Sequence, residues 1–468
     1  MPEYKDQNIG QAEKLSIDLH PPQDAVAQDA VFGEITEEGP NYRNVGWVGA
    51  VAIMLKTQFG LGILSIPQVL DSLGIIPGII CLLAVAAITT WSNFVIGQFK
   101  LNHPDVYAID DAGDLMFGRV GREVLGIGVC IYWIFCTGSG LLSTSIGLNA
   151  VSSHGTCTAV FVAGAAIVSF SFASIRTLGK IKWTAWAGVF SIFTAVMVAT
   201  IAVGIQGGPS TVEAAAYDNN WTSDYKLVGS PSFTEGITAV SSIVFAYAGT
   251  PGFFPIAAEM RNPSTYTRSL LICQSFITGI YIAVGTVLYY YCGSHVASPA
   301  LGSAGPLLKK IAYGIALPGL VASTVIVLHF SSKCLFVRIL RGSTHLTSNS
   351  FKHWTTWFGC TFAITISSYL IASGIPIFGD LVSLVGALLG TAMSFQPMGC
   401  MWLYDNWKQG RENPSLKWAL LSAWNIFILV IGSFVMVAGT YGSIVNIIAS
   451  SKAASGSSAW SCSDNSNS

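Results

Sequence analysis

Eleven apolar stretches recur along this chain, and each is about as long as a helix that crosses a membrane. A helix of roughly 20 apolar residues spans the hydrocarbon core of a lipid bilayer. The chain is 52% hydrophobic and 10% charged, whereas a soluble domain has roughly 25% charged residues. One soluble core cannot bury so much apolar surface, so we predict an all-α polytopic protein embedded in the bilayer. The predicted spans are residues 45–70, 75–98, 124–149, 157–174, 183–206, 234–258, 270–292, 316–337, 354–373, 376–403 and 418–441.

The two ends of the chain differ in composition from the apolar part. Residues 1–44 contain nine acidic and three basic residues and show no apolar periodicity, so we predict that they form a disordered acidic tail. Residues 442–468 are predicted to form a short C-terminal tail rich in serine and asparagine. The transmembrane domain is then residues 45–441.

The distribution of basic residues predicts the orientation. Of the 23 lysines and arginines, 18 fall in segments on the side of the N-terminus, four fall on the other side, and Lys56 lies within a span. Because basic residues concentrate on the cytoplasmic side, we predict a multi-pass plasma membrane protein with a cytoplasmic N-terminus. The sequon at Asn220 lies in the long outer linker, where it would be available for glycosylation. The net charge of −1 gives no indication of nucleic-acid binding.

Ten cysteines are scattered along the chain without the spacing of a metal site, so we predict neither a metal site nor a cofactor. Cys157 and Cys292 lie near span ends and Cys462 lies in the C-terminal tail, and a disulfide could form among these three. The chain has no G-x-x-x-x-G-K-S/T sequence and no clustered pair of carboxylates in its loops. Neither ATP-driven transport nor enzyme activity is therefore expected.

Two of the predicted spans are interrupted by glycine and proline, which weaken a helix. The first span contains KTQFGLGILSIP (Lys56–Pro67), and the sixth contains FAYAGTPGFFP (Phe245–Pro255). Five crossings separate the starts of these spans, so the two spans run in opposite directions. This arrangement predicts a five-plus-five inverted repeat with discontinuous helices 1 and 6.

The interruptions predict a binding site for a zwitterion. Backbone that leaves a helix inside the membrane must be buried or line a cavity. Freed N–H groups attract an anion, as a helix N-terminus does, and freed carbonyls attract a cation. The two kinds of receptor lie about one small molecule apart, which indicates an amino acid, although glycine and proline could also merely kink packed helices. The groups concerned are the N–H groups near Gly60, Gly62 and Ile63 and the carbonyls near Phe245, Ala246 and Ala248.

The interrupted regions carry a family resemblance. The stretches GLGILSIP (Gly60–Pro67), FAYAGTP (Phe245–Pro251) and AAEMRNPS (Ala257–Ser264) resemble signature regions of the amino acid/auxin permease family, also called the amino acid transporter transmembrane family. The resemblance is greatest to fungal neutral amino acid permeases and covers about residues 45–441. It implies the fold of the bacterial leucine transporter, with the substrate held between helices 1, 3, 6 and 8.

The resemblance also implies which side chains surround the substrate. Helix 3 would contribute Tyr132 and Cys136, and helix 8 would contribute Ser323 and Thr324. Tyr247 would shape the side-chain pocket together with Phe245. Ordinary helix packing is the alternative for each aromatic residue.

Four ionisable residues within or at the ends of the predicted spans are the informative ones, because such residues indicate function inside a membrane. Lys56 precedes the first interruption by one turn, and we predict that it carries a proton or stands where sodium would bind. A fixed counter-charge for the freed carbonyls is the alternative for Lys56, and His329 is the second candidate for proton transfer. Glu259 is predicted to form a salt bridge or gate at the cytoplasmic edge, and Asp380 to lie near an outer vestibule.

These features together predict a secondary active transporter that imports neutral aliphatic and aromatic amino acids. We expect proton symport through alternating access, because a second cation close to Lys56 would be repelled. The hydroxyls of Ser323 and Thr324 leave sodium coupling open as an alternative. A membrane receptor that binds amino acids without transporting them, and an ion channel, are rival hypotheses.

Overall fold

The computed structural model describes residues 27–29, 33–35, 45–60, 62–175, 178–209, 221–346, 348–375, 377–453, 460 and 462–466. Within these residues, ten helical segments are long and apolar enough to cross a membrane. The shorter apolar helix α5 (Thr158–Ala173) coincides with the fourth predicted span. The prediction of an all-α membrane fold is confirmed, and α5 accounts for the difference between ten segments and eleven predicted spans.

Among the described residues, the first half of the transmembrane domain contains six α-helices and one 3-10 turn. The second half contains nine α-helices, a π-helical turn and four 3-10 turns. The first half consists of α1 (Trp47–Gln58), η1 (Gly62–Leu64), α2 (Ile66–Leu73), α3 (Ile75–Asn102), α4 (Ile109–Ser152), α5 and α6 (Leu178–Gln206). The second half consists of α7 (Phe233–Tyr247), α8 (Thr250–Glu259), α9 (Tyr266–Cys292), α10 (Pro306–Leu340), α11 (Phe351–Gly374), α12 (Phe378–Leu384), η7 (Val385–Gly390), α13 (Thr391–Ser394), α14 (Gln396–Glu412) and α15 (Leu416–Ala453). Short 3-10 turns lie at η3 (Pro263–Thr265), η4 (Gly293–His295), η5 (Ala300–Ser303) and η6 (Thr344–Leu346).

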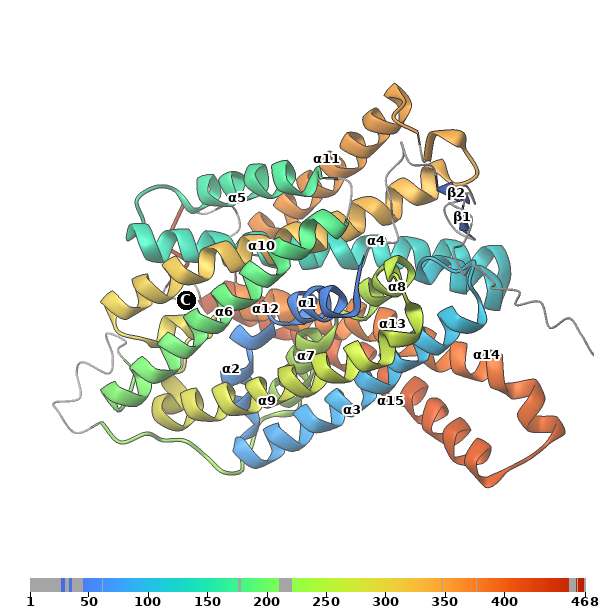
Figure 1. Cartoon of the computed structure of the whole chain (residues 1–468). Helices are drawn as coiled ribbons and strands as arrows, with labels where there is room; N and C mark the ends of the chain where they lie inside the picture. The colour runs from blue at the N-terminus through green and yellow to red at the C-terminus, as the bar shows by residue number, and fades with distance from the viewer. Residues whose placement is uncertain are drawn as a thin grey trace, which may run out of the picture.

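Both predicted interruptions are present. The first break (residues 59–65) separates α1 from α2, and the second break (residues 248–249) separates α7 from α8. Pro67 and Pro251 lie in the first turns of α2 and α8, where proline is tolerated because the first N–H groups of a helix have no partner within it. Figure 1 shows α1 and α7 near the centre of the helical bundle. The breaks are therefore enclosed by other helices, as backbone outside a helix requires in a membrane.

Four helices form a separate block beside the broken ones. Each of α4, α5, α10 and α11 packs against the other three. Close approach within this block depends on glycine: a Cβ atom added to Gly140 of α4 would lie 2.4 Å from the hydroxyl oxygen of Thr324 of α10. The broken helices contact α3, α6, α9, α12 and α15, and they also touch the block, since α1 contacts α10 and α8 contacts α4 and α10. The bundle thus contains a four-helix block and a set of helices around the breaks.

The ends of the chain differ from the predicted tails. Strands β1 (Ala27–Asp29) and β2 (Gly33–Ile35) pair antiparallel in the N-terminal segment, and the other residues of 1–44 lie outside the described residues, as does Asn220. The predicted boundary of the C-terminal tail at residue 442 is wrong. The last helix continues to Ala453 because residues 441–448 are still mostly apolar.

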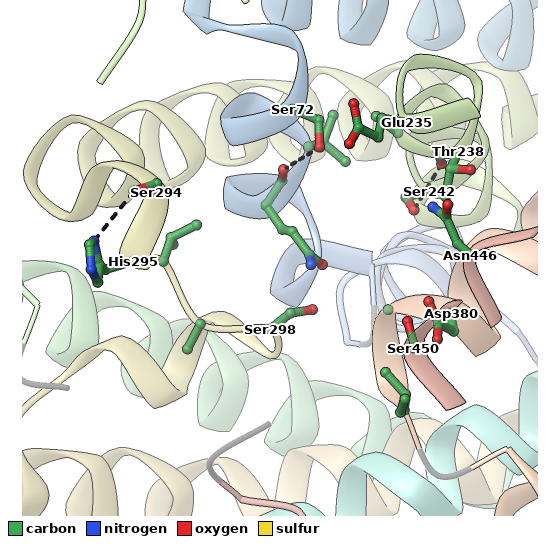
Figure 2. A pocket seen from close by; sticks show the side chains of 17 residues that line it. Ser72, Glu235, Thr238, Ser242, Ser294, His295, Ser298, Asp380, Asn446 and Ser450 are labelled. Carbon is green, nitrogen blue, oxygen red and sulfur yellow. Dashed lines mark hydrogen bonds between the residues drawn. The ribbon is translucent and has the colours of Figure 1, made fainter. Parts of the chain in front are cut away.

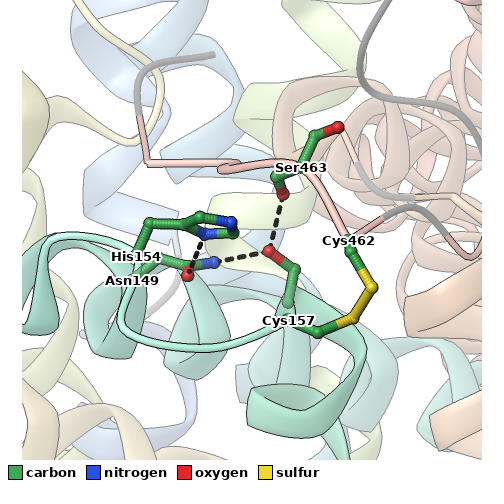
Figure 3. The surroundings of a disulfide bond; sticks show 6 residues. Asn149, His154, Cys157, Cys462 and Ser463 are labelled. Atoms are coloured by element: carbon green, nitrogen blue, oxygen red, sulfur yellow. Dashed lines mark hydrogen bonds between the residues drawn. A yellow bond between two sulfur atoms is a disulfide. The ribbon is translucent and has the colours of Figure 1, made fainter.

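A disulfide joins the C-terminal segment to the start of α5. The bond links Cys157 to Cys462, which confirms one of the pairings among the three candidate cysteines, while Cys292 is buried and not disulfide-bonded. The hydroxyl of Thr158 donates a hydrogen bond of 2.6 Å to the carbonyl of Ser463 (Figure 3). The described C-terminal residues, 460 and 462–466, therefore form a strap, which we call the C-terminal strap.

The C-terminal strap contacts all four helices of the block. The side-chain amide of Asn149 in α4 donates a 2.7 Å hydrogen bond to Asn465. Lys309 of α10 donates to the carbonyl of Ser466 at 2.5 Å. The main-chain N–H of Trp460 donates to the carbonyl of Ser373 in α11 at 3.0 Å. With the disulfide to α5, the strap holds one end of the whole block.

The disulfide also constrains the topology. Cys157 and Cys462 must lie on the same side of the membrane, so an even number of crossings separates them. Seven of the ten long segments follow Cys157, and the number becomes even when α5 crosses as well. Disulfides persist in oxidising compartments, so the bond supports the predicted orientation, in which this side is the outer one.

Thiol labelling tests this arrangement. On intact cells, a membrane-impermeant maleimide should not react with Cys157 or Cys462 in the wild type, because both are in the disulfide. The variant Cys462→Ser should expose the thiol of Cys157 and permit labelling from outside. Replacing the buried Cys292 by serine is the control and should leave labelling unchanged. Labelling of Cys157 only after permeabilisation would contradict the proposed orientation.

Candidate functional site

Lys56 stabilises the carbonyl end of α1 at the first break. Its side chain is buried, and Nζ lies 3.4 Å from the carbonyl oxygen of Phe59 and 3.3 Å from that of Gly188 in α6. The C-terminus of a helix carries partial negative charge, so an ammonium group is favourable here. A Cβ atom added to Gly60 would lie 2.2 Å from Oγ of Ser323, so α10 also approaches this break.

The two breaks lie against each other. A Cβ atom added to Gly62 would be 2.6 Å from Cα of Ala246, so only glycine permits this approach. The hydroxyl of Tyr281 in α9 lies 2.9 Å from the carbonyl oxygen of Gln58 and 3.0 Å from that of Ala246. Sequence analysis missed Tyr281, because a tyrosine among the apolar residues of a span has no distinguishing pattern.

Helix α4 reaches the second break through Tyr132. The Tyr132 hydroxyl donates a hydrogen bond to the carbonyl of Ala248, at the position where the resemblance placed a pocket wall. Cys136, one turn further along α4, is buried. The hydroxyl of Tyr247 points elsewhere and donates to Thr278 of α9 at 2.9 Å.

Not all predicted residues meet at the breaks. Ile63 lies in the first break and Phe245 in the last turn of α7, and both are buried. The hydroxyl of Thr324 bonds within its own helix, to the carbonyl of Leu320 at 2.9 Å. The residues that the structure brings together at the breaks are Lys56, Gly60, Gly62, Tyr132, Ala246, Ala248 and Ser323.

His329 faces away from the breaks. Its Nδ1 atom lies 3.5 Å from the carbonyl oxygen of Ala173 at the end of α5, and its ring packs edge-on against Trp357 of α11. Six residues separate His329 from Ser323, and six residues turn an α-helix by about 240° beyond one full turn. The two side chains therefore project from different faces of α10.

One end of the bundle, predicted to be cytoplasmic, is closed by buried interactions. Glu259 at the end of α8 forms an ion pair with Lys333 of α10, and the hydroxyl of Tyr107 donates to the same carboxylate at 3.2 Å. The main chain closes this end too: Val45 donates to the carbonyl of Glu259 at 3.1 Å, and Arg261 donates to the carbonyl of Val45 at 2.8 Å. The predicted salt bridge of Glu259 thus forms with a residue of another helix.

The opposite end contains a polar cavity of about 480 Å³. It is lined by residues of α2, α7, α12, α15 and the segment after η4. Figure 2 shows Glu235 and Thr238 of α7 on one wall, and Asp380 and Ser450 close to each other on another. Asp380 therefore lines a cavity at the predicted outer end. The two ends of the bundle differ, since one is sealed and one is hollow.

Comparisons with known proteins give one consistent family. Residues 43–445 match the family described as "Transmembrane amino acid transporter protein". A "Transmembrane transporter" of Gibberella moniliformis is 33% identical over 451 residues, which cover 95% of this chain and 94% of that protein. The "N amino acid transport system protein" of Neurospora crassa is 32% identical over 458 residues, which cover 96% of this chain and 92% of that protein.

Solved structures share the fold. The structure of MhsT in complex with L-phenylalanine matches with a TM-score of 0.56 at 11% identity, covering 85% of this chain and 98% of that one. A Na⁺-coupled sialic acid symporter matches with a TM-score of 0.53 at 13% identity, covering 86% and 92%. The predicted fold of the bacterial leucine transporter is confirmed by these matches.

The buried ion pair at the sealed end leads to a prediction about thermal stability. Replacing Lys333 by methionine leaves the carboxylate of Glu259 buried without its ion-pair partner, which costs about 3 kcal/mol. We expect a lower midpoint of thermal unfolding for purified Lys333→Met, and a midpoint closer to that of the wild type for Glu259→Gln/Lys333→Met. Lys310→Met, which changes an exposed lysine of the same helix, is the control. A double variant that loses the sum of the single effects would show that the pair is not coupled.

Proposed function

Since the chain belongs to the family of transmembrane amino acid transporter proteins, we propose that it imports neutral amino acids by proton symport. The proposed cargo is aliphatic and aromatic amino acids, and the proposed location is the plasma membrane with the N-terminus in the cytoplasm. Alternating access would move the substrate from the hollow end of the bundle to the sealed end.

The chemistry of the breaks supports a neutral zwitterion as the substrate. The carbonyl ends of α1 and α7 favour an ammonium group, and the N-terminal ends of η1 and α8 favour a carboxylate. The polar side chains that contact the breaks include those of Lys56, Tyr132, Tyr281 and Ser323, and none of these four is acidic. A second positive charge on a cationic amino acid would therefore have no carboxylate partner among them.

The position of Lys56 is the observation that carries the proton proposal. Its ammonium group lies between the carbonyls of Phe59 and Gly188, close to the place where Ser323 meets Gly60. A sodium ion at these carbonyls would meet a like charge in a medium of low dielectric constant. A buried lysine can release and regain a proton, so Lys56 is the proposed proton carrier.

Competition experiments test the substrate class. Unlabelled leucine and phenylalanine should each reduce the uptake of radiolabelled leucine by the wild-type protein in vesicles. Lysine should compete weakly, because no described acidic side chain contacts the breaks to pair with its additional charge. Strong competition by lysine with no competition by phenylalanine would contradict the proposed cargo.

Replacement of Lys56 tests the coupling. In proteoliposomes without sodium, an imposed inward proton gradient should drive concentrative leucine uptake by the wild type. Lys56→Met should lose this drive. Lys56→Arg keeps the positive charge but holds its proton at all accessible pH values, so it should also lose the drive if Lys56 carries the proton.

Two outcomes would contradict the coupling proposal. Proton-driven uptake by Lys56→Arg would show that Lys56 is a fixed counter-charge, and uptake that requires sodium and ignores the proton gradient would exclude proton symport. Lys100→Met is the matched control, because Lys100 is also buried and also binds two main-chain carbonyls, but at the end of α3. This control should retain proton-driven uptake.

A further inference from the structure

Tyr281 joins the two broken helices through one hydroxyl group. The phenol oxygen lies 2.9 Å from the carbonyl oxygen of Gln58, at the end of α1, and 3.0 Å from that of Ala246, near the end of α7. The Tyr281 side chain is fully buried. Its ring packs edge-on against Tyr247, with 5.3 Å between the ring centroids, so the hydroxyl is held in place by packing.

The hydroxyl separates two groups that repel each other. Both carbonyls lie at or near the C-terminal ends of helices, which carry partial negative charge. A tyrosine hydroxyl has one hydrogen, so it can fully satisfy only one of the two carbonyls at a time. The Gln58 carbonyl also accepts a hydrogen bond from the main-chain N–H of Gly60 at 3.0 Å. A carbonyl oxygen has two lone pairs, so the carbonyl to which the hydroxyl does not donate keeps acceptor capacity for a further donor.

The surroundings of the hydroxyl indicate that the second donor is a ligand. The side chain of Gln58 is 2% exposed, and neither its amide oxygen nor its amide nitrogen has a hydrogen-bond partner among the described residues. A buried amide without partners is unfavourable. The Gln58 amide therefore has hydrogen-bonding capacity for a polar group that the described residues do not supply.

We propose that Tyr281 is a positioning residue that sets the geometry of the receptor for the substrate ammonium group. Its hydroxyl holds the carbonyls of Gln58 and Ala246 at a fixed spacing. A substrate ammonium group then binds the carbonyl to which the hydroxyl does not donate its hydrogen. No metal ion is needed to draw the two carbonyls together. This inference rests on the proposed transport of neutral amino acids.

The test compares two ligands that differ only in the ammonium group. Phenylalanine and 3-phenylpropionate share a carboxylate and an aromatic ring, and only the first has the ammonium group. Wild-type protein and Tyr281→Phe, reconstituted at equal amounts, are assayed for phenylalanine uptake and for its inhibition by 3-phenylpropionate. We expect Tyr281→Phe to raise KM for phenylalanine about tenfold and to leave the inhibition constant of 3-phenylpropionate nearly unchanged.

The ratio of KM for phenylalanine to the inhibition constant of 3-phenylpropionate distinguishes a positioning role of Tyr281 from a general loss of stability. A purely structural defect would weaken both ligands equally. An equal change in both constants, or an unchanged KM for phenylalanine, would overturn the proposal. The matched control is Tyr289→Phe, which removes another buried hydroxyl of α9 that accepts a hydrogen bond from Lys226 outside the breaks. The control should keep the wild-type ratio. Absence of phenylalanine uptake by the wild type would instead contradict the proposed function.

Discussion

The supply of hydrogen-bond donors to main-chain carbonyls inside the membrane is the constraint on which this structure depends. Hydrocarbon offers no water, so a carbonyl that leaves a helix there needs a partner from the protein. At the two breaks the partners are Lys56 of α1, Tyr132 of α4 and Tyr281 of α9. Because these donors come from three helices, the bonds that satisfy the breaks also fix how α1, α4, α7 and α9 lie relative to one another.

The same broken helices connect the breaks to the sealed end of the bundle. Helix α8 begins at the second break and ends at Glu259, which is paired with Lys333 of the four-helix block. The main chain around Val45, directly before α1, is bonded to the end of α8. Opening the sealed end therefore requires separating a buried ion pair and two main-chain hydrogen bonds. The ion pair joins α8 to α10, and the two main-chain bonds join the segment before α1 to the end of α8.

The four-helix block is held by different means. The C-terminal strap contacts α4, α5, α10 and α11, and its disulfide to Cys157 makes the contact covalent. The contacts of the strap's described residues lie at the end predicted to be outside, and those named above involve none of the broken helices. A displacement of α1 and α7 relative to the block would leave the strap in place. Alternating access by relative movement of two sets of helices is compatible with this construction.

The sequence by itself determined the spans, the two breaks and the glycines that let the breaks meet, because these depend on local composition and on the backbone preferences of glycine and proline. It also identified Lys56 and Tyr132. Only the tertiary structure decided the roles that depend on partners far along the chain. Glu259 pairs with Lys333, His329 turns toward α5, and Cys157 selects Cys462 at a separation of 305 residues. Only the tertiary structure identified Tyr281 as part of the site. Its hydroxyl contacts both breaks, which are more than 180 residues apart in the chain.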